Sequence, residues 1–287
     1  MTRIAASSHG EARVRMLRLV RRGDRHDPRE LTASFRLEGA FEPAFLEGRA
    51  DGLLPGEALK RLVHRITREQ GTRELEELGL AFARAVLERQ ASVTRIRVDL
   101  HEAVWHRLEA GGKAQLQAFV AGSAEQRVAA ITSNGPQTSV VGGIDGLTLM
   151  RSAGFAPPRR GSGDIPDDSG ASDGLQPLLV GELSARWTYT NGDITFGVYR
   201  KGIRGAILDT FAWHQGISVQ HLLYATADVV LATCEELADV TLTFHERPYR
   251  PADLFISGVE NPDELFVVVD EPVGTVQVTV ERTADST

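Results

Sequence analysis

The feature that most constrains this 287-residue chain is that its two halves show the same succession of spacings between apolar residues. In each half, apolar residues first alternate at every second position, then recur every three or four positions, and then alternate again. The first period is typical of half-buried strands and the second of amphipathic helices. Both halves therefore predict the order strand–strand–helix–helix–strand–strand. Since a helix pair must cover one face of each sheet, the expected fold is α+β, with two such units in tandem.

The two copies are expected at residues 1–134 and 135–287, because Asn134-Gly135-Pro136 is a turn signal between them. The first copy is expected to contain strands at 13–21, 30–38, 96–100, 114–121 and 125–132, the last two as a hairpin, and helices around 59–66 and 75–86. The second is expected to contain strands at 138–151, 183–191, 239–245, 264–269 and 275–280, and helices at 203–213 and 218–232. Gly, Ser, Asp and Pro dominate residues 156–177, which predicts a mobile surface loop.

Each predicted sheet has bare edge strands, which are a liability unless another strand pairs with them. Two units side by side, with several chains joined edge to edge, could close a β-barrel without free edges. The duplicated unit by itself therefore predicts a homo-oligomer.

Composition argues against several classes of function. A net charge of −7 is unlike the basic footprint of a nucleic-acid-binding protein. No apolar run is long enough to span a membrane, and residues 1–8 lack the apolar core of a signal peptide. The single cysteine, Cys234, has apolar neighbours, so we expect a buried, unreactive thiol and a cytoplasmic location. His101 and His106 are five residues apart at the end of a predicted strand, which does not fit a zinc-binding helix, and we expect no metal site.

The stretch between the two helices of the second half has the residues of a helix start. Gly216 ends the first helix, and Ser218 is a good N-cap for the second. The backbone N–H of Val219 and the amide of Gln220 then lie in the first turn, where free donors attract an electron-rich ligand edge. A Gln side chain can recognise the edge of a flat, amide-like heterocycle. An ordinary capped helix with a solvated Gln220 fits the same pattern.

Several stretches resemble the urate oxidase (uricase) family, which has the tunnelling fold (T-fold). They follow the family's order along nearly the whole chain and are Glu77–Ala83, Gln117–Phe119, Gly146–Ser152, Ala206–Ala212, Ile217–Gln220 and Asn261–Phe266. The resemblance implies tandem T-fold units with antiparallel sheets, paired helices on one face of each sheet, and a homotetramer whose β-barrel surrounds a tunnel. It also implies oxidation of urate by molecular oxygen without a cofactor.

The resemblance assigns part of a binding site. Family members stack urate flat on a Phe, bind one edge with a Gln and the preceding backbone N–H, and clamp another edge with an Arg. Phe155 lies at the stacking position, and Val219 and Gln220 match the edge contacts. In the family, oxygen chemistry uses a Lys–Thr pair from the neighbouring subunit and a His, with an Asn over the ring.

At the remaining positions this sequence departs from the family. The Lys falls on Glu11, and the Thr-Asp pair falls on Gly56-Glu57. The clamping Arg falls on Pro177, and the Asn-Lys-His segment falls on Glu246-Arg247-Pro248, with His245 adjacent. Glu11, Glu57 and His245 are therefore our candidates for the replacement proton relay. A carboxylate in place of an ammonium disfavours an anionic substrate. Because the Arg clamp and the Lys–Thr relay are missing, we expect weak or absent urate oxidation compared with family members.

Two functions remain open at this point. One is a cofactor-free, urate-oxidase-like enzyme acting on urate or a related purine or pteridine. The other is a catalytically silent paralogue, either a heterocycle-binding homo-oligomer or a partner subunit for an active uricase. The retained Phe155, Val219 and Gln220 favour the first, and the joint displacement of Lys, Thr, Arg and His favours the second.

Overall fold

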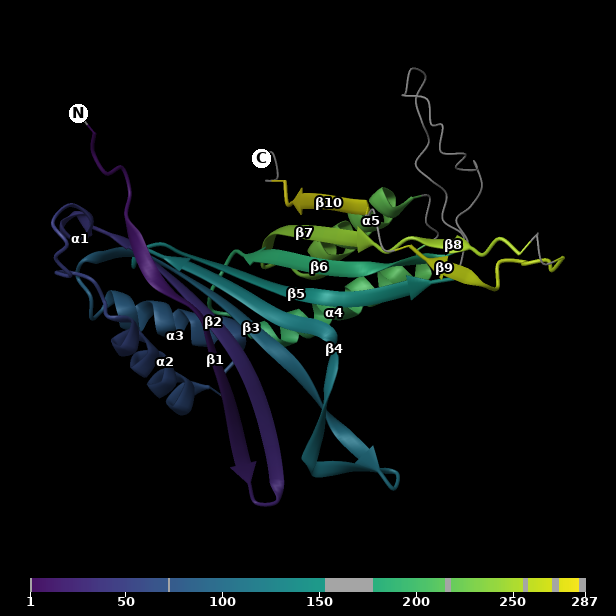
Figure 1. Ribbon diagram of the computed structural model, residues 1–287, viewed down its shortest axis with the longest axis horizontal. Coiled ribbons are helices and arrows are strands. Elements are labelled where there is room, and N and C mark those ends of the chain that lie inside the picture. The colour runs from purple at the N-terminus through teal and green to yellow at the C-terminus, as the bar shows by residue number, and fades with distance from the viewer. Residues whose placement is uncertain are drawn as a thin grey trace. The chain divides into compact units, whose positions relative to one another are not determined.

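A computed structural model describes residues 2–71, 73–152, 178–214, 218–254, 258–269 and 274–283. The chain forms two compact units, Met1–Asp145 with Thr188–Gly197, and Gly146–Trp187 with Val198–Thr287. Each unit contains antiparallel strands and a pair of long helices, which confirms the predicted α+β class (Figure 1). The limits 1–134 and 135–287 concern the sequence repeat and stay a prediction.

The sheet of the first unit has the strand order β1-β2-β3-β4-β5, with antiparallel neighbours. Its strands are β1 Ser8–Arg22, β2 Arg25–Gly39, β3 Val93–Ala110, β4 Lys113–Ser133 and β5 Thr138–Arg151, the last of which continues into the second unit. Its helices are α1 Glu42–Leu46, α2 Gly56–Gln70 and α3 Leu75–Leu87. The short helix α1 was not predicted, because five residues are too few to show the helical spacing of apolar residues.

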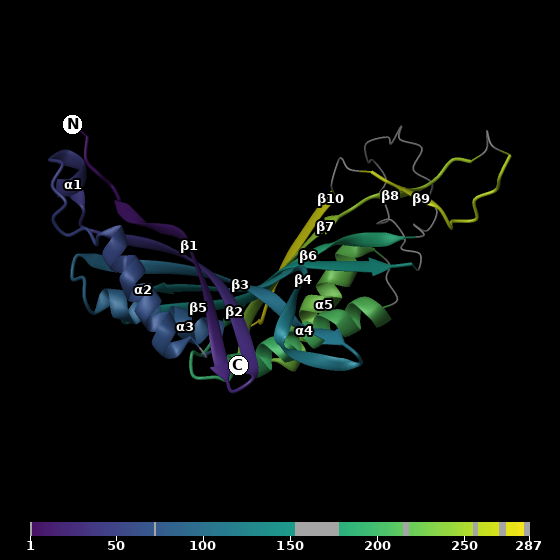
Figure 2. The same ribbon diagram turned by 60° about the horizontal axis from the view of Figure 1, so that its bottom comes forward.

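The core of the first unit is formed by the buried faces of its strands and its helices. Alternate residues of β2, among them Leu31 and Leu37, are almost completely buried. They belong to one hydrophobic cluster with the apolar stripes of α2 and α3, and the rings of Phe35 and Phe82 meet edge to face at 5.6 Å. Both helices lie against the same face of these strands (Figure 2). Alternation in the strand and the helical stripe therefore predicted the buried faces correctly.

The expected hairpin at 114–121 and 125–132 is wrong. Residues 113–133 form one strand, β4, which pairs with β3 along both segments. The pairing shifts between Ala103 and Trp105, where the surplus residues of β4 are accommodated. Because both segments share one partner strand, the break between them is a bulge and not a reversal. The strand β3 also continues to Ala110, so His101 lies within a strand and not at its end.

The second unit has the strand order β5-β6-β7-β10. Its further elements are β6 Leu179–Tyr189, α4 Phe196–Trp213, α5 Val219–Thr233, β7 Leu237–Glu246, β8 Tyr249–Pro251, β9 Phe266–Val268 and β10 Gly274–Glu281. The strand expected at 264–269 is shorter than predicted and pairs with β8 in a separate two-stranded sheet. Strand β10 pairs with β7 instead.

Burial in the second unit agrees with the predicted helix faces. Leu222, Leu223 and Val230 of α5 are buried, as is Ile207 of α4. Cys234 is free and buried, and burial raises the pKa of its thiol, which confirms the expected buried position. In the described part of the chain, no helix is long and apolar enough to span a bilayer. The predicted loop at 156–177 lies outside the described residues.

Candidate functional site

Two of the predicted site residues meet where β1 contacts the beginning of α2. Glu11 belongs to β1, and Glu57 lies in the first turn of α2. Lys60, one turn further along α2, places its Nζ 3.6 Å from Glu11 Oε2 and 3.0 Å from Glu57 Oε1. The side chain of Glu11 is 27% exposed, whereas that of Glu57 is 74% exposed. The structure thus brings Glu11 and Glu57 to one ammonium group, with Glu11 the more enclosed partner.

Glycine at position 56 leaves the space that Glu11 occupies. A Cβ added to Gly56 would lie 1.8 Å from Glu11 Oε1, far closer than two non-bonded atoms approach each other. The carboxylate of Glu11 and any side chain at position 56 therefore exclude each other in this arrangement. The replacements at positions 11 and 56 are physically coupled, which the sequence alone did not indicate.

A backbone irregularity follows Glu11 directly. The pairing of β1 with β2 shifts between Glu11 and Val14, and Arg13 has a φ of 58°. The N–H of Arg13 donates to Ser34 Oγ at 3.0 Å. A bulge of this kind can redirect a neighbouring side chain, and left-handed backbone is uncommon outside glycine. Here the bulge lies beside the residue whose carboxylate reaches α2.

Electrostatic interactions favour the charged forms of Lys60 and Glu57. The hydrogen bond to Glu57, together with the negative charge of Glu11, raises the pKa of the Lys60 ammonium. The same hydrogen bond lowers the pKa of Glu57. Reasoning from the sequence missed Lys60, although a signal exists. The chain has three lysines, Lys60, Lys113 and Lys201, among 32 lysine and arginine residues, so a lysine is unusual in it.

The second group of predicted site residues lies at the beginning of α5. Ser218 has an extended backbone, and its Oγ accepts a hydrogen bond from the N–H of His221 at 3.2 Å, which confirms the predicted N-cap. Val219 is half-buried and Gln220 is exposed. Helix geometry leaves the N–H groups of Val219 and Gln220 without acceptors inside the helix. Donors are thus available for a ligand, and the ligand role itself stays a prediction.

A stacked pair of imidazole rings lies at this junction. His214 Nε2 lies 2.9 Å from His221 Nδ1, and the rings stack with centroids 4.9 Å apart. The Arg151 guanidinium donates to the carbonyl oxygens of Phe211 and His214 at the end of α4. Burial, with the nearby His221 and Arg151, lowers the pKa of His214. The sequence reasoning missed this pair, whose signal is two histidines on either side of the N-cap Ser218.

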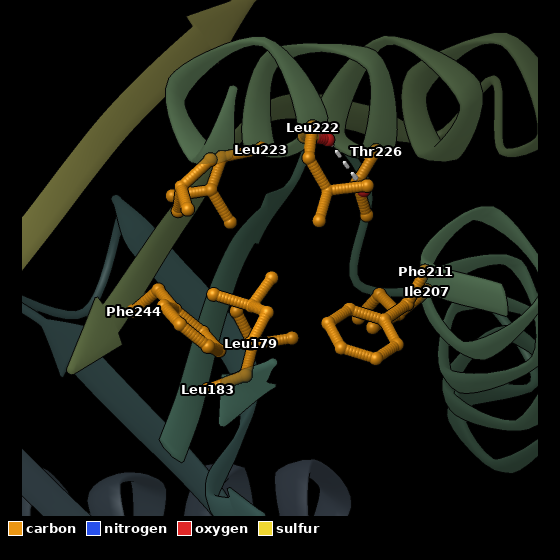
Figure 3. Close-up of a pocket in the computed structure, with 9 residues that line it drawn as sticks. Leu179, Leu183, Ile207, Phe211, Leu222, Leu223, Thr226 and Phe244 are labelled. Atoms are coloured by element: carbon orange, nitrogen blue, oxygen red, sulfur yellow. Dashed lines mark hydrogen bonds between the residues drawn. The ribbon is translucent and has the colours of Figure 1, made fainter. Parts of the chain in front are cut away.

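The space beneath the beginning of α5 is apolar and almost filled (Figure 3). A cavity of about 10 Å³ remains, which is room for roughly one water molecule. Its lining includes Leu179, Phe211, Val219 and Phe244. The Val219 side chain thus belongs to the core. A heterocycle bound by Gln220 would have to lie outside this cavity.

The other predicted site residues are more scattered. His245 lies in β7, and its Nδ1 is 3.0 Å from Thr275 Oγ1 of β10. The next residue, Glu246, is half-buried, and burial raises the pKa of its carboxyl group. Phe155 and Pro177 lie outside the described residues. Within the described ranges, no three His, Cys, Asp or Glu side chains gather as metal ligands would.

Comparison with known proteins gives consistent matches. Residues 141–277 match the family model named Uricase. The uricase of Arthrobacter globiformis is 26% identical over 281 residues, covering 97% of this chain and 90% of the relative. The uricase of Danio rerio is 25% identical over 285 residues, covering 96% and 94%.

Solved structures share the fold. The crystal structure of the Arthrobacter globiformis uricase matches with a TM-score of 0.88 at 24% identity, covering 100% of this chain and 97% of that chain. A uricase from Bacillus fastidious matches with a TM-score of 0.78 at 17% identity, covering 96% and 93%. These likenesses confirm the predicted T-fold architecture. The family model over residues 141–277, the uricases that align along nearly the whole chain and the shared fold together show that this chain is similar to the uricases.

Proposed function

We propose that this chain is a urate-oxidase-like enzyme that oxidises urate, or a related purine or pteridine, with molecular oxygen and without a cofactor. The observation that carries the proposal is the capped beginning of α5 in a chain of this family. There Ser218 fixes the helix start, and Val219 and Gln220 offer donors for the amide edge of a flat heterocycle. Phe155 is proposed as the stacking surface.

Such a reaction requires the protein to handle protons. The heterocycle loses two electrons and two protons, and dioxygen accepts both the electrons and the protons to become hydrogen peroxide. Removing a ring proton makes the heterocycle a better electron donor, so a general base promotes the reaction. We propose Glu11, Glu57 and His245 for this work, in place of the family's Lys–Thr pair and His.

We propose a rate of urate oxidation below that of other uricases. The expected clamp position holds Pro177, which cannot make the bidentate, charge-assisted contact of an arginine. Each lost contact of that kind costs about 1.5–3 kcal/mol. Two or three such losses lower turnover by orders of magnitude.

We also propose a homotetramer with the site at subunit interfaces, as in the family that the sequence resembles. A tetramer pairs the sheet edges that a single chain leaves open. Light scattering of the purified protein at micromolar concentration should give a mass near four times 31.3 kDa. A monomeric mass would refute this assembly.

One observation favours the alternative function, a catalytically silent paralogue. The Glu11 carboxylate fills the space beside Gly56, so the present arrangement has no room for a threonine side chain there. Calorimetric titration of the intact oligomer with a panel of purines and pteridines, followed by an assay for substrate loss, separates the two functions. The enzyme should bind a heterocycle and consume it in air. Binding without consumption, or no binding at all, would support the silent subunit.

A further inference from the structure

We propose that His214 and His221 form a pH-sensitive histidine pair that holds the beginning of α5 in the conformation that binds the heterocycle. This inference rests on the proposed function, because it adds a regulation to the ligand contacts proposed for Val219 and Gln220. The two histidines are positioning residues, since they act on the ligand through the helix that carries Gln220. The pair is expected to be closed at neutral pH and to open in acid.

The histidine pair joins the two long helices of the second unit. His214 directly follows Trp213, the last residue of α4, and His221 lies in the first turn of α5. His214 Nε2 and His221 Nδ1 lie 2.9 Å apart, and the rings stack with an angle of 29° between their planes. A hydrogen bond between two imidazole nitrogens requires a proton on one of them and a lone pair on the other. The contact is therefore lost when both of these nitrogens carry protons.

Backbone hydrogen bonds attach each ring to its own helix. The N–H of His214 donates to the carbonyl oxygen of Thr210 in α4 at 2.9 Å. The N–H of His221 donates to Ser218 Oγ, which caps α5. The ring contact is thus a side-chain link between the end of α4 and the helix turn that contains Gln220.

The groups that face the pair add positive charge when the imidazoles take up protons. The Arg151 guanidinium of β5 donates to the carbonyl oxygen of His214. Among the described residues, burial, followed by the charges of His221 and Arg151, lowers the pKa of His214. The nearest titratable residues along the sequence of α4 and α5 are Asp209 and Tyr224, both exposed. A second proton on the pair is therefore repelled by the first and by Arg151.

The core beneath α5 offers no compensating charge. Of the described side chains that line the small cavity there, those from β6 and β7 are all apolar, namely Leu179, Leu183 and Phe244 (Figure 3). Apolar surroundings disfavour a charged imidazole. The protonated rings are therefore more stable in water than at this junction.

The direction of the pH effect follows from the lowered pKa of His214. In an open junction His214 binds a proton at its ordinary pKa of 6.5, whereas in the closed pair it does so only at lower pH. Because protons bind more readily to the open form, acid shifts the population towards that form. The closed pair is fully favoured above about pH 6.5 and is lost as the pH falls through the folded pKa.

Opening of the pair lowers the affinity of the helix start for a heterocycle. Gln220 and the N–H groups of the first turn bind a planar edge only while the turn keeps one conformation. The apparent Kd rises as the fraction of molecules in the binding conformation falls. The loss therefore affects every ligand of this site, including one whose own charge stays constant.

The test is calorimetric titration of the intact oligomer with hypoxanthine, a purine that stays uncharged between about pH 5 and pH 7.5, where histidine titrates. The Kd of the wild type should be at least ~3-fold higher at the lower pH. His214→Gln keeps a hydrogen-bonding partner for His221 and does not titrate, so its Kd should change less than ~2-fold. Asp209→Asn removes the nearest titratable group of α4 and should keep the pH dependence of the wild type.

A second measurement needs no ligand. Hydrogen–deuterium exchange of residues 218–224, corrected for the intrinsic effect of pH on exchange, reports how often the beginning of α5 opens. Protection in the wild type should fall ~10-fold over the same pH step, whereas in His214→Gln it should change less than ~2-fold. His221→Gln also removes one titrating ring and replaces His214→Gln if that variant does not assemble.

The outcomes separate the two claims. Protection of α5 that is constant in the wild type, or that falls equally in His214→Gln, would refute the histidine pair as the pH-sensitive element. The expected change in protection with an unchanged Kd would refute its control of the ligand site. A wild type that binds no hypoxanthine at either pH would count against the proposed function and against this control, while the exchange data would still decide whether the pair opens.

Discussion

The β1–α2 contact of the first unit and the α4–α5 junction of the second are built from different interactions. At the first, opposite charges meet, with Lys60 between Glu11 and Glu57. At the second, a serine hydroxyl caps a helix and two imidazole rings share a hydrogen bond. The first should respond to the removal of a charge. The second should respond to the loss of a hydrogen bond and to pH close to the imidazole range.

The two regions also differ in their likeness to the family. The family model matches residues 141–277, a span that includes Val219 and Gln220 and excludes Glu11, Gly56 and Lys60. The departures that the sequence showed at Glu11 and Gly56 thus lie outside the matched span. Pro177 and Glu246-Arg247-Pro248, where the sequence also departs from the family, lie inside the matched span, so the departures occur in both units.

A large effect on the rate is expected from Gly56→Ala. The new methyl group would displace the Glu11 carboxylate, whose end lies 1.8 Å from the added Cβ position. Because the displaced group is the flexible end of a side chain, the free energy of unfolding should change by less than about 1 kcal/mol. The kcat/KM should fall ~10- to 100-fold, since the displaced Glu11 carboxylate loses its contact with Lys60 and its present orientation.

Gly202→Ala is the matched control for this variant. Gly202 lies in α4, and an added Cβ there meets nothing within 4 Å. It should raise the free energy of unfolding by up to about 1 kcal/mol and leave the rate unchanged. Equal rates for the two glycine variants and the wild type would contradict the coupling of positions 11 and 56.

Gln220→Leu tests the second region. The substitution keeps the volume and removes both kinds of hydrogen-bonding group, so the polar edge of the ligand is buried without a partner. We expect a loss of about 1–3 kcal/mol, which is ~5- to 150-fold in Kd by calorimetric titration. Asp228→Asn, at an exposed position two turns further along α5, should bind like the wild type. Unchanged binding by Gln220→Leu would place the ligand elsewhere.

Ser218→Ala should have a smaller effect, and on stability. Ser218 is buried and accepts the hydrogen bond from the N–H of His221. Loss of an N-cap typically costs about 1 kcal/mol, which urea unfolding can measure. Ser218→Asp keeps a capping oxygen and should recover most of the loss. If Ser218→Ala were as stable as the wild type, the cap would not hold this junction.

The smallest expected effect is a difference between the pH ranges in which His214 and Glu57 change the stability of the fold. His214 has a folded pKa below its ordinary 6.5, so the folded state binds fewer protons than the unfolded state below that pH. Its contribution to stability is present above about pH 6.5 and is lost as the pH falls through the folded pKa. Glu57, with a pKa lowered from 4.5, contributes stability above about pH 4.5, and this contribution is lost as the pH falls through the folded pKa.

His214→Gln should therefore flatten the dependence of the urea midpoint on pH just below 6.5 and leave the dependence below pH 4.5 unchanged. Glu57→Gln should do the reverse. An identical pH profile for the wild type and His214→Gln would contradict the lowered pKa of His214.

The sequence predicted the features that local pattern controls. Alternation through Leu31 and Leu37 identified the buried face of β2, and Ser218 identified a helix start, because period and capping act over a few residues. Lys60 was missed because its contact with Glu11 joins distant parts of the chain and depends on the bulge in β1. The false hairpin within β4 has a similar cause, since the choice between a turn and a bulge depends on the partner strand.

Oxygen uptake by the purified protein, supplied with urate and a metal chelator, tests the central claim most directly. Our account predicts that dioxygen and urate disappear in equal amounts, at a rate below that of the uricases it resembles and unaffected by the chelator. A wild-type tetramer that binds urate yet consumes no dioxygen would contradict the enzymatic function and leave the silent subunit as the account of this chain.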